Sequence, residues 1–212
     1  MNLSKSLEEN YNHIKTDFVD CSDFLIRKAK TGNREFLIMV CDGLIDSLQL
    51  SQMVVSPILR CDEIDIDTIK KSITNSVELN EAETFADCYY YVMSGFAVVL
   101  VDGEDKALAF GVQSPPARSV DVPSNEQSTK APKEAFVEVL NTNKALLRKR
   151  LKTPHLKLKQ IKLASSAPMP CVIAYMDDRA DKELVSQITL ALQSSNLNTL
   201  TDFGTLVPKS VR

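Results

Sequence analysis

The sequence predicts an α/β protein built from two small subdomains, and three observations support this class. Apolar runs of strand length occur at 36–41, 96–101 and 171–176, with amphipathic helical periodicity between them. A proline-rich segment interrupts the chain near its middle, as a linker or long loop does. The two halves also resemble each other in sequence, which suggests an internal duplication.

The expected order of elements begins with a helical arm over 1–20, in which apolar residues recur three or four positions apart. A first α/β subdomain over 21–115 follows, and a second over 116–212. For the first subdomain we expect strands at 23–28, 36–41, 96–101 and 107–112. We expect helices at 47–59, 65–73 and 81–93.

The second subdomain is expected to be organised by one long helix. Pro132 suits a first helical turn, and the pattern predicts a helix from Lys133 to Leu151. Its apolar stripe consists of Phe136, Leu140, Leu147 and Leu151, and the first three of these are expected to lie beneath a sheet. Strands at 156–163 and 171–176 and a helix at 181–192 complete the prediction.

The internal similarity appears when the chain is shifted by 135 residues. Asp46 then falls on Asp181, within a matching order of strand, strand, aspartate and helix. We therefore expect 24–59 and 159–194 to superpose as similar units.

Composition excludes several classes of protein. No apolar run approaches the roughly 20 residues of a membrane-spanning helix, and the first residues do not resemble a signal peptide. The five cysteines form no C-x-x-C pair and indicate a reducing compartment. The net charge of −3 argues against a general nucleic-acid binder, although acidic residues cluster over 62–105 and basic ones over 144–162.

The sequence contains no recognisable catalytic or cofactor motif. The two histidines, His13 and His155, have no metal-ligand spacing around them, and the chain lacks a glycine-rich phosphate loop. Asp46 and Asp181 are better explained as helix-start carboxylates than as cation ligands. We therefore expect no enzyme activity, no cofactor and no metal.

The basic run Arg148–Lys152 lies where the long helix should end, and there cations complement the exposed carbonyl groups. Contact with a partner or an anionic membrane surface is the alternative; no aromatic residue is interleaved for stacking on bases. Asn143, on the apolar stripe, is typical of an amide hydrogen-bonded to a neighbouring loop, with direct ligand contact as the alternative.

Three consecutive motifs carry a family resemblance. They are Arg-x-Val-x-x-Pro-x-x-Glu at 118–126, Pro-Lys-Glu-x-Phe-x-Glu at 132–138 and Thr-Asn-x-x-Leu-x-Arg-x-Arg at 142–150. Together they resemble the A subunit of bacterial spore germinant receptors, the GerA family. The resemblance covers about 100–200 and, less sharply, 36–46.

The resemblance implies a soluble N-terminal region of a membrane-bound receptor subunit, facing the spore core from the inner spore membrane. The implied partners are the other receptor subunits, the membrane region of the parent chain and a nutrient germinant, either an amino acid or a sugar. Two function classes stay open: a signalling and assembly module, or a domain that binds the nutrient in a cleft between its subdomains. The candidate contact residues are Arg118, Glu126, Lys133, Glu134, Asn143, Arg148 and Arg150.

Overall fold

The computed structural model describes residues 1–32, 34–73, 78–114, 135–163 and 168–194. It combines helices with antiparallel sheets, which confirms the predicted α/β class. The chain divides into two compact units. The first comprises Met1–Asp17 and Asp23–Thr153, and the second comprises Phe18–Ser22 and the residues from Pro154 onward.

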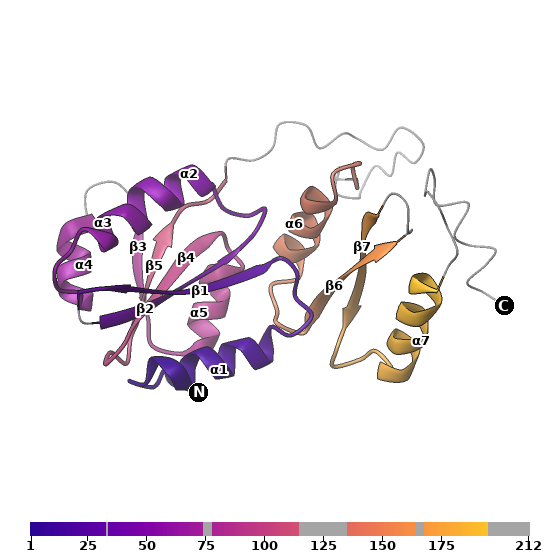
Figure 1. Cartoon of the computed structure of the whole chain (residues 1–212), viewed down its shortest axis with the longest axis horizontal. Coiled ribbons are helices and arrows are strands. Elements are labelled where there is room, and N and C mark those ends of the chain that lie inside the picture. Colours follow the sequence, from indigo (N-terminus) through magenta and orange to yellow (C-terminus); the bar gives the residue numbers. More distant parts are fainter. Residues whose placement is uncertain (33, 74–77, 115–134, 164–167, 195–212) are drawn as a thin grey trace. The chain divides into compact units, whose positions relative to one another are not determined.

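The first unit is built on a five-stranded sheet in the order β1-β2-β4-β5-β3, in which every neighbouring pair is antiparallel (Figure 1). Its strands are β1 (Phe24–Thr31), β2 (Arg34–Cys41), β3 (Leu79–Ala82), β4 (Phe96–Val101) and β5 (Ala107–Gly111).

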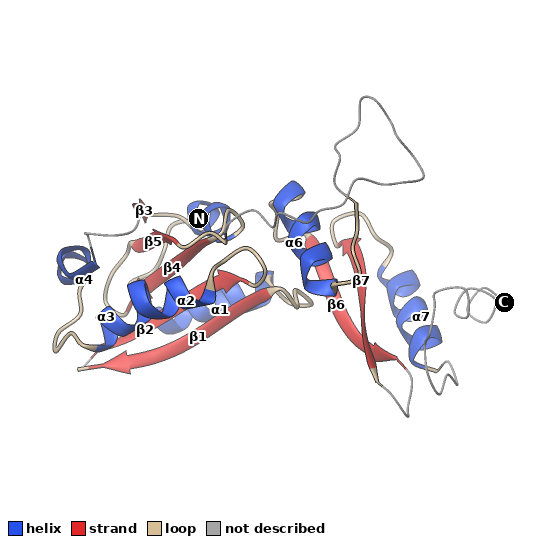
Figure 2. Cartoon of the chain, turned by 90° about the horizontal axis from the view of Figure 1, so that it is seen from above, coloured by secondary structure: helices blue, strands red, loops and turns tan. Residues whose placement is uncertain are grey.

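Helices cover both faces of this sheet (Figures 1 and 2). One face carries α2 (Ser47–Gln49), α3 (Ser56–Leu59) and α4 (Ile66–Ile73), and the other carries α1 (Leu7–Asp17) and α5 (Phe85–Val92). Apolar residues of β2 and β4 such as Phe36 and Val99 pack with Val54 and Ile58 in one buried cluster. Because both central strands are covered on both faces, they read as continuous apolar runs rather than alternating ones.

The sequence predicted a helical arm over 1–20. The helix α1 forms there, but it packs against the sheet of the first unit. Leu7 and Ile14 of α1 are buried, at 3% and 0% exposure, and α1 packs against β2. Its apolar stripe is therefore part of the core of the first unit.

The predicted helix at 47–59 forms, with Val54 and Ile58 buried and Leu48 64% exposed. A π-helical turn over Leu50–Val55 lies between α2 and α3, and in it Ser56 donates to the Ser51 carbonyl. Pro57 has no N–H to continue the ordinary ladder, and the wider turn rotates the following residues.

The expected helix at 81–93 begins later than predicted, because β3 occupies its first residues. Thr84 caps α5: its hydroxyl accepts from the Asp87 amide at 3.1 Å, while the Asp87 carboxylate accepts from the Thr84 amide at 3.2 Å. This capping box fixes the start of α5 immediately after β3.

The second unit contains an antiparallel pair, β6 (Leu156–Leu163) and β7 (Met169–Met176), with α7 (Lys182–Gln193) against one face (Figure 2). The Asp181 carboxylate accepts from the Glu183 amide at 2.8 Å and caps α7. The short segment Phe18–Ser22 lies beside β6, since the Leu158 amide donates to the Asp20 carbonyl at 2.9 Å.

The two units divide the chain elsewhere than at the expected boundary of 115/116. Helix α6 (Leu140–Arg150) belongs to the first unit, and the chain passes to the second unit after Thr153. The physical reason is an ion pair and close backbone packing that join α6 to the β1–β2 hairpin, described below.

Part of the expected similarity between the halves is seen along the chain. With the 135-residue shift, β2 falls on β7 residue for residue and the start of α2 falls on the start of α7, whereas β1 falls three residues beyond β6. Asp46 caps its helix by accepting from the Leu48 amide at 2.8 Å, as Asp181 does for α7. Whether the two halves superpose in space stays a prediction.

Candidate functional site

The third motif lies wholly within α6, which begins at Leu140 rather than Lys133. The Asn143 side chain accepts from the Val137 amide at 2.8 Å and donates to the Val137 carbonyl at 2.7 Å. Val139, the residue before the helix, is extended. These bonds hold the preceding backbone outside the helix, so Asn143 has the loop-bonding role expected of it.

Arg148 is the best-defined side chain of the site. Its Nε donates to Asp23 Oδ2 at 2.7 Å and its Nη2 donates to Asp23 Oδ1 at 3.1 Å. The Arg148 side chain is 0% exposed and that of Asp23 1% exposed. A two-point guanidinium–carboxylate bond of this kind is directional and is strengthened by the dry surroundings.

The third contact of Arg148 is with the backbone: Nη1 donates to the Thr153 carbonyl at 2.6 Å. The chain leaves the first unit at Phe18–Ser22 and returns to it at Asp23, and Thr153 is the last residue of the first unit. One guanidinium therefore holds two of the points at which the chain enters or leaves the first unit. We call Arg148, Asp23 and Thr153 the clamp.

Helix α6 also packs on the turn that ends β2. Gly43 has φ +81, and a Cβ there would lie 3.1 Å from Ala145 Cβ and 3.2 Å from the Asn141 carbonyl oxygen. Asn141 in turn donates to Asp42 Oδ2 at 3.4 Å. Glycine thus serves both the left-handed turn and the close approach of α6.

These contacts correct three expectations. Phe136 is 64% exposed and does not anchor the helix, and Leu151 is 43% exposed. Arg148, expected at the surface, is buried, whereas Arg150 in the same last turn is exposed. The buried face of α6 is set by Lys144 and Arg148, one turn apart, rather than by the leucine stripe.

Four candidate residues lie outside the described residues: Arg118, Glu126, Lys133 and Glu134. Their roles stay predictions.

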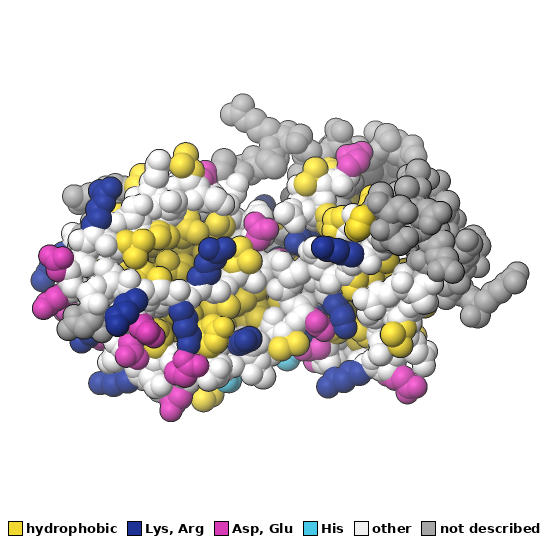
Figure 3. Space-filling model, in the orientation of Figure 1, with side chains coloured by type: hydrophobic (Ala, Val, Ile, Leu, Met, Phe, Trp, Pro, Cys, Tyr) yellow, Lys and Arg dark blue, Asp and Glu magenta, His cyan; other side chains and the backbone are white. Residues whose placement is uncertain are grey.

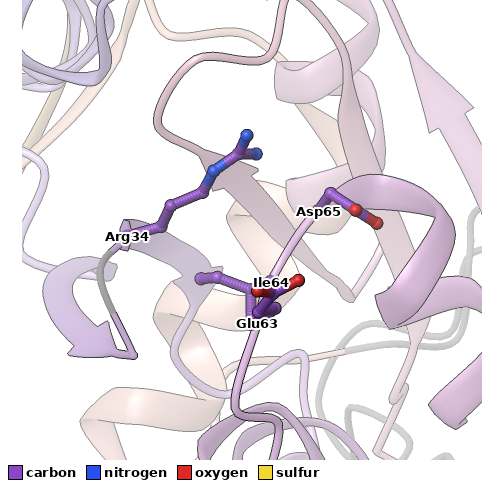
Figure 4. Close-up of a pocket in the computed structure, with 4 residues that line it drawn as sticks. All are labelled: Arg34, Glu63, Ile64 and Asp65. Atoms are coloured by element: carbon purple, nitrogen blue, oxygen red, sulfur yellow. The ribbon is translucent and has the colours of Figure 1, made fainter.

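A small cavity of about 190 Å³ in the first unit is lined by Arg34, Glu63, Ile64 and Asp65 (Figure 4). Arg34 Nη1 donates to Glu104 at 3.0 Å, and Asp65 Oδ1 accepts from the Thr68 amide at 2.6 Å. That amide bond is the main reason why the pKa of Asp65 lies below its usual value. The cavity is smaller than the roughly 300–1,000 Å³ of typical ligand pockets.

In the second unit, His155 has carboxylate neighbours that spacing along the chain did not reveal. Its Nδ1 lies 2.8 Å from Asp177 Oδ1, and atoms of His155, Asp177 and Asp178 that can bind a metal lie within 4.8 Å of one another. The buried Lys157 ammonium is 3.2 Å from Asp177 Oδ2. The Lys157 ammonium therefore already neutralises the negative charge of the Asp177 carboxylate, which a metal ion would need as a ligand.

Burial raises the pKa of Asp177, but hydrogen bonds from His155 and Lys157 outweigh that effect and leave it below the usual value. The arrangement is therefore that of an ion-paired cluster. Pairing between β6 and β7 brings it together, because His155 and Asp177 flank the paired ends of the two strands.

Comparison with known proteins decides the family. The family model described as "Bacillus/Clostridium GerA spore germination protein" matches residues 12–209. The chain belongs to this GerA family.

Among GerA-like relatives, spore germination protein B1 of Bacillus subtilis (strain 168) is 30% identical over 97% of this chain and 44% of its own length. The uncharacterized membrane protein YfkQ of the same organism is 24% identical over 95% of this chain and 40% of its own length. The chain thus spans less than half of these curated relatives.

A solved relative shares the fold. The crystal structure of the N-terminal domain of the A subunit of the Bacillus megaterium spore germinant receptor GerK3 matches with a TM-score of 0.71 and 25% identity. The match covers 93% of this GerA-family chain and 74% of the GerK3 chain. Within the described residues, no helix is long and apolar enough to cross a membrane.

Proposed function

We propose that this chain is the N-terminal module of a germinant-receptor A subunit and takes part in relaying the nutrient signal that starts spore germination. Membership of the GerA family and the likeness to the GerK3 N-terminal domain support the role in germination. The relay is inferred from the clamp. In this proposal the module works without catalysis, as part of a complex with the other receptor subunits.

The clamp favours relay because of where it lies along the chain. In this proposal, a change at Ser22 or after Thr153 reaches the first unit through the Asp23 carboxylate and the Thr153 carbonyl, both of which Arg148 binds. Buried ion pairs contribute little net stability relative to apolar residues of similar size, whereas breaking one by removing a single partner is costly. In this proposal, the paired clamp and an unpaired clamp are the two states of the relay.

The alternative, direct binding of an amino acid or sugar, has weaker support among the described residues. The cavity beside Arg34 is small, and its Arg34 and Asp65 side chains already have hydrogen-bond partners. We therefore propose a role in assembly and relay rather than in ligand binding. The proposed location is the core-facing side of the inner spore membrane, with the membrane attachment supplied by the parent chain.

The test is to replace the clamp with apolar residues in the full-length subunit, as Asp23→Leu combined with Arg148→Met. This double variant should fold about as stably as the wild type, because the buried charges are removed together. Spores carrying it should accumulate the subunit normally but respond poorly to nutrient. A normal nutrient response would contradict the relay through the clamp.

The control is a trigger that bypasses the nutrient receptors. Variant spores should respond to it as wild-type spores do. Each single variant, Asp23→Leu or Arg148→Met, should instead lower the amount of folded subunit, which separates loss of the fold from loss of relay.

A further inference from the structure

The outer side of β1 has no partner strand within the described residues, because β1 is the first strand of its sheet and pairs only with β2. The Asp42 amide donates to the Asp23 carbonyl at 2.7 Å, which makes these two residues a hydrogen-bonded pair of the ladder. Bonded and non-bonded pairs alternate along an antiparallel ladder. The N–H and C=O groups of Ile26, Lys28 and Lys30 therefore point away from β2, and we call them the β1 edge.

The β1 edge is regular enough to accept another strand. The register with β2 runs without interruption from the pair Phe24 and Cys41 to the pair Thr31 and Arg34, so no bulge turns the edge away. The strand has 8 residues and no proline, and each outward N–H is therefore a donor. In the described part of the chain, no hydrogen bond to these outward backbone groups is found. Such an edge is a template for pairing with an extended chain.

The side chains beside the β1 edge are apolar at one end and cationic further along. Leu25 is 44% exposed, and Arg27 and Lys30 are exposed and form no ion pair with any described residue. Lys28 already pairs with Glu8 of α1. Figure 3 shows hydrophobic side chains interrupted by Lys and Arg in the region where Figure 1 places β1.

The cations lie on both faces of β1. Side chains alternate along a strand, and Ala29 packs against the same apolar cluster as Ile58 of α3. Arg27 therefore lies on the face that α3 covers, whereas Lys28 and Lys30 lie on the face of α1. A strand that pairs with the β1 edge would meet a cation on each of its own faces.

From these observations we propose that the β1 edge is a docking site for an extended acidic segment of another protein, which adds a strand to the sheet of the first unit. Backbone hydrogen bonds to the edge provide the affinity. Acidic side chains of the incoming segment pair with Arg27 and Lys30 and set its register, and an apolar side chain covers Leu25. This interaction goes beyond the proposed relay and requires no change in the clamp.

The charges oppose a second copy of the chain as the occupant. Two β1 edges would bring like charges together, which is how edge cations ordinarily prevent such pairing. The opposite edge strand of the sheet, β3, carries Glu81, but this carboxylate already pairs with Lys70 and Lys106. An anionic membrane surface would attract the same cations, but it offers no strand to bond the outward backbone groups.

Hydrogen exchange tests the docking site. The probe is a short peptide, blocked at both ends, that alternates glutamate with valine, and the control peptide has lysine in place of glutamate. When the 212-residue chain binds the acidic peptide, the amides of Ile26, Lys28 and Lys30 should exchange about tenfold more slowly. The amides of Leu25 and Arg27 already face β2 and should change little. The lysine peptide should protect none of them.

Two substitutions at one position separate the backbone from the charge. Lys28→Pro and Lys28→Ala both remove the ammonium group, but only proline also removes the outward N–H. Lys28→Pro should therefore bind the acidic peptide about tenfold more weakly than Lys28→Ala does. A variant that leaves the backbone unchanged, Arg27→Glu combined with Lys30→Glu, should lose the acidic peptide and bind the lysine peptide instead.

Equal binding by Lys28→Pro and Lys28→Ala, or protection that does not alternate along β1, would overturn the proposal. Edge protection that appears in the 212-residue chain alone and rises with its concentration would overturn it in favour of a second copy. The same protection in the full-length subunit without peptide would assign the edge to a segment of that subunit. Binding to phosphatidylglycerol vesicles without binding to the acidic peptide would show that the cations serve a membrane surface instead.

Discussion

Asp23 and Arg148 lie 125 positions apart and form an ion pair at 2.7 Å that solvent does not reach. The pair explains why a helix that follows the proline-rich segment belongs to the first unit rather than the second. Arginine suits this position because its planar fork satisfies both carboxylate oxygens of Asp23 and the Thr153 carbonyl at once.

The first prediction is that Arg148→Ala lowers the free energy of unfolding by about 3–5 kcal/mol, because Asp23 is left charged and unpaired in a dry site. Arg150→Ala, two residues away on the exposed side of α6, should change it by about 0.5 kcal/mol or less. Urea titration of the 212-residue chain measures both variants. Equal losses in the two variants would contradict the buried pair.

The same titration distinguishes the exposed Phe136 of the structure from the buried Phe136 predicted from the sequence. If Phe136 were buried, its replacement by alanine would lower the free energy of unfolding by about 3–5 kcal/mol. Because Phe136 is 64% exposed, we expect Phe136→Ala to cost about 0.5 kcal/mol or less. A cost near that of Arg148→Ala would show that the ring is buried.

The contrast between Phe136 and Arg148 shows where sequence reasoning succeeds in this protein. Runs such as 36–41 and 96–101 are continuous and apolar because sheet pairing and two layers of helix cover them, and local pattern reports that directly. The described strands other than β3, and most helices, were therefore predictable. Asp46 and Asp181 were also predicted correctly as helix-start carboxylates, because capping is a local interaction.

Long-range pairing could not be predicted in this way. Nothing near Arg148 indicates that its partner is Asp23, and a cationic last helical turn ordinarily lies in solvent. The start of α6 was missed because the bonds from Asn143 to Val137 compete with helix formation. His155 likewise meets Asp177 only through the pairing of β6 with β7.

The second prediction concerns the contact between α6 and the turn after β2. Gly43→Ala should destabilise the chain by more than the roughly 1–2 kcal/mol that a left-handed residue costs, because the new methyl group meets Ala145 and Asn141. Gly103→Ala is the matched control, since Gly103 has φ +87 and nothing lies within 4 Å of the added Cβ.

The difference between the two alanine variants measures how closely α6 packs. Combining Gly43→Ala with Ala145→Gly should recover part of that difference by vacating the space that the methyl group enters. If Gly43→Ala and Gly103→Ala melt at the same temperature, α6 does not pack on this turn in solution.

The third prediction is a pH dependence in the second unit. Burial, together with a hydrogen bond to Asp20, raises the pKa of Tyr175 from 10.0 to about 12. The folded state therefore holds the phenol proton more tightly than the unfolded state does. This contribution to stability is complete below pH 10.0 and is lost as the pH rises toward about 12.

Tyr175→Phe should accordingly lose less stability than the wild type across that alkaline window. Denaturant unfolding of both proteins at several pH values between neutrality and pH 12 measures the difference. The Tyr175 hydroxyl donates to Asp20 Oδ2 at 3.1 Å, so the variant should also be somewhat less stable at neutral pH. Parallel pH profiles for the two proteins would contradict the raised pKa.

The fourth prediction transfers the expected partner contact from Arg148 to the exposed end of α6. Lys149 and Arg150 are exposed and lie in the last helical turn, beside a guanidinium that is committed to the clamp. In the full-length receptor we expect them to face a carboxylate-bearing surface of another subunit, for which a cationic patch provides attraction and orientation.

Replacing both by glutamate should leave the unfolding midpoint of the 212-residue chain nearly unchanged. The same change should reduce co-purification of the other subunits and slow the nutrient response of spores. Replacing both by glutamine should give a weaker defect, because it removes the attraction without adding repulsion. Normal assembly and normal germination of the glutamate variant would show that this end of α6 is only a solvated surface.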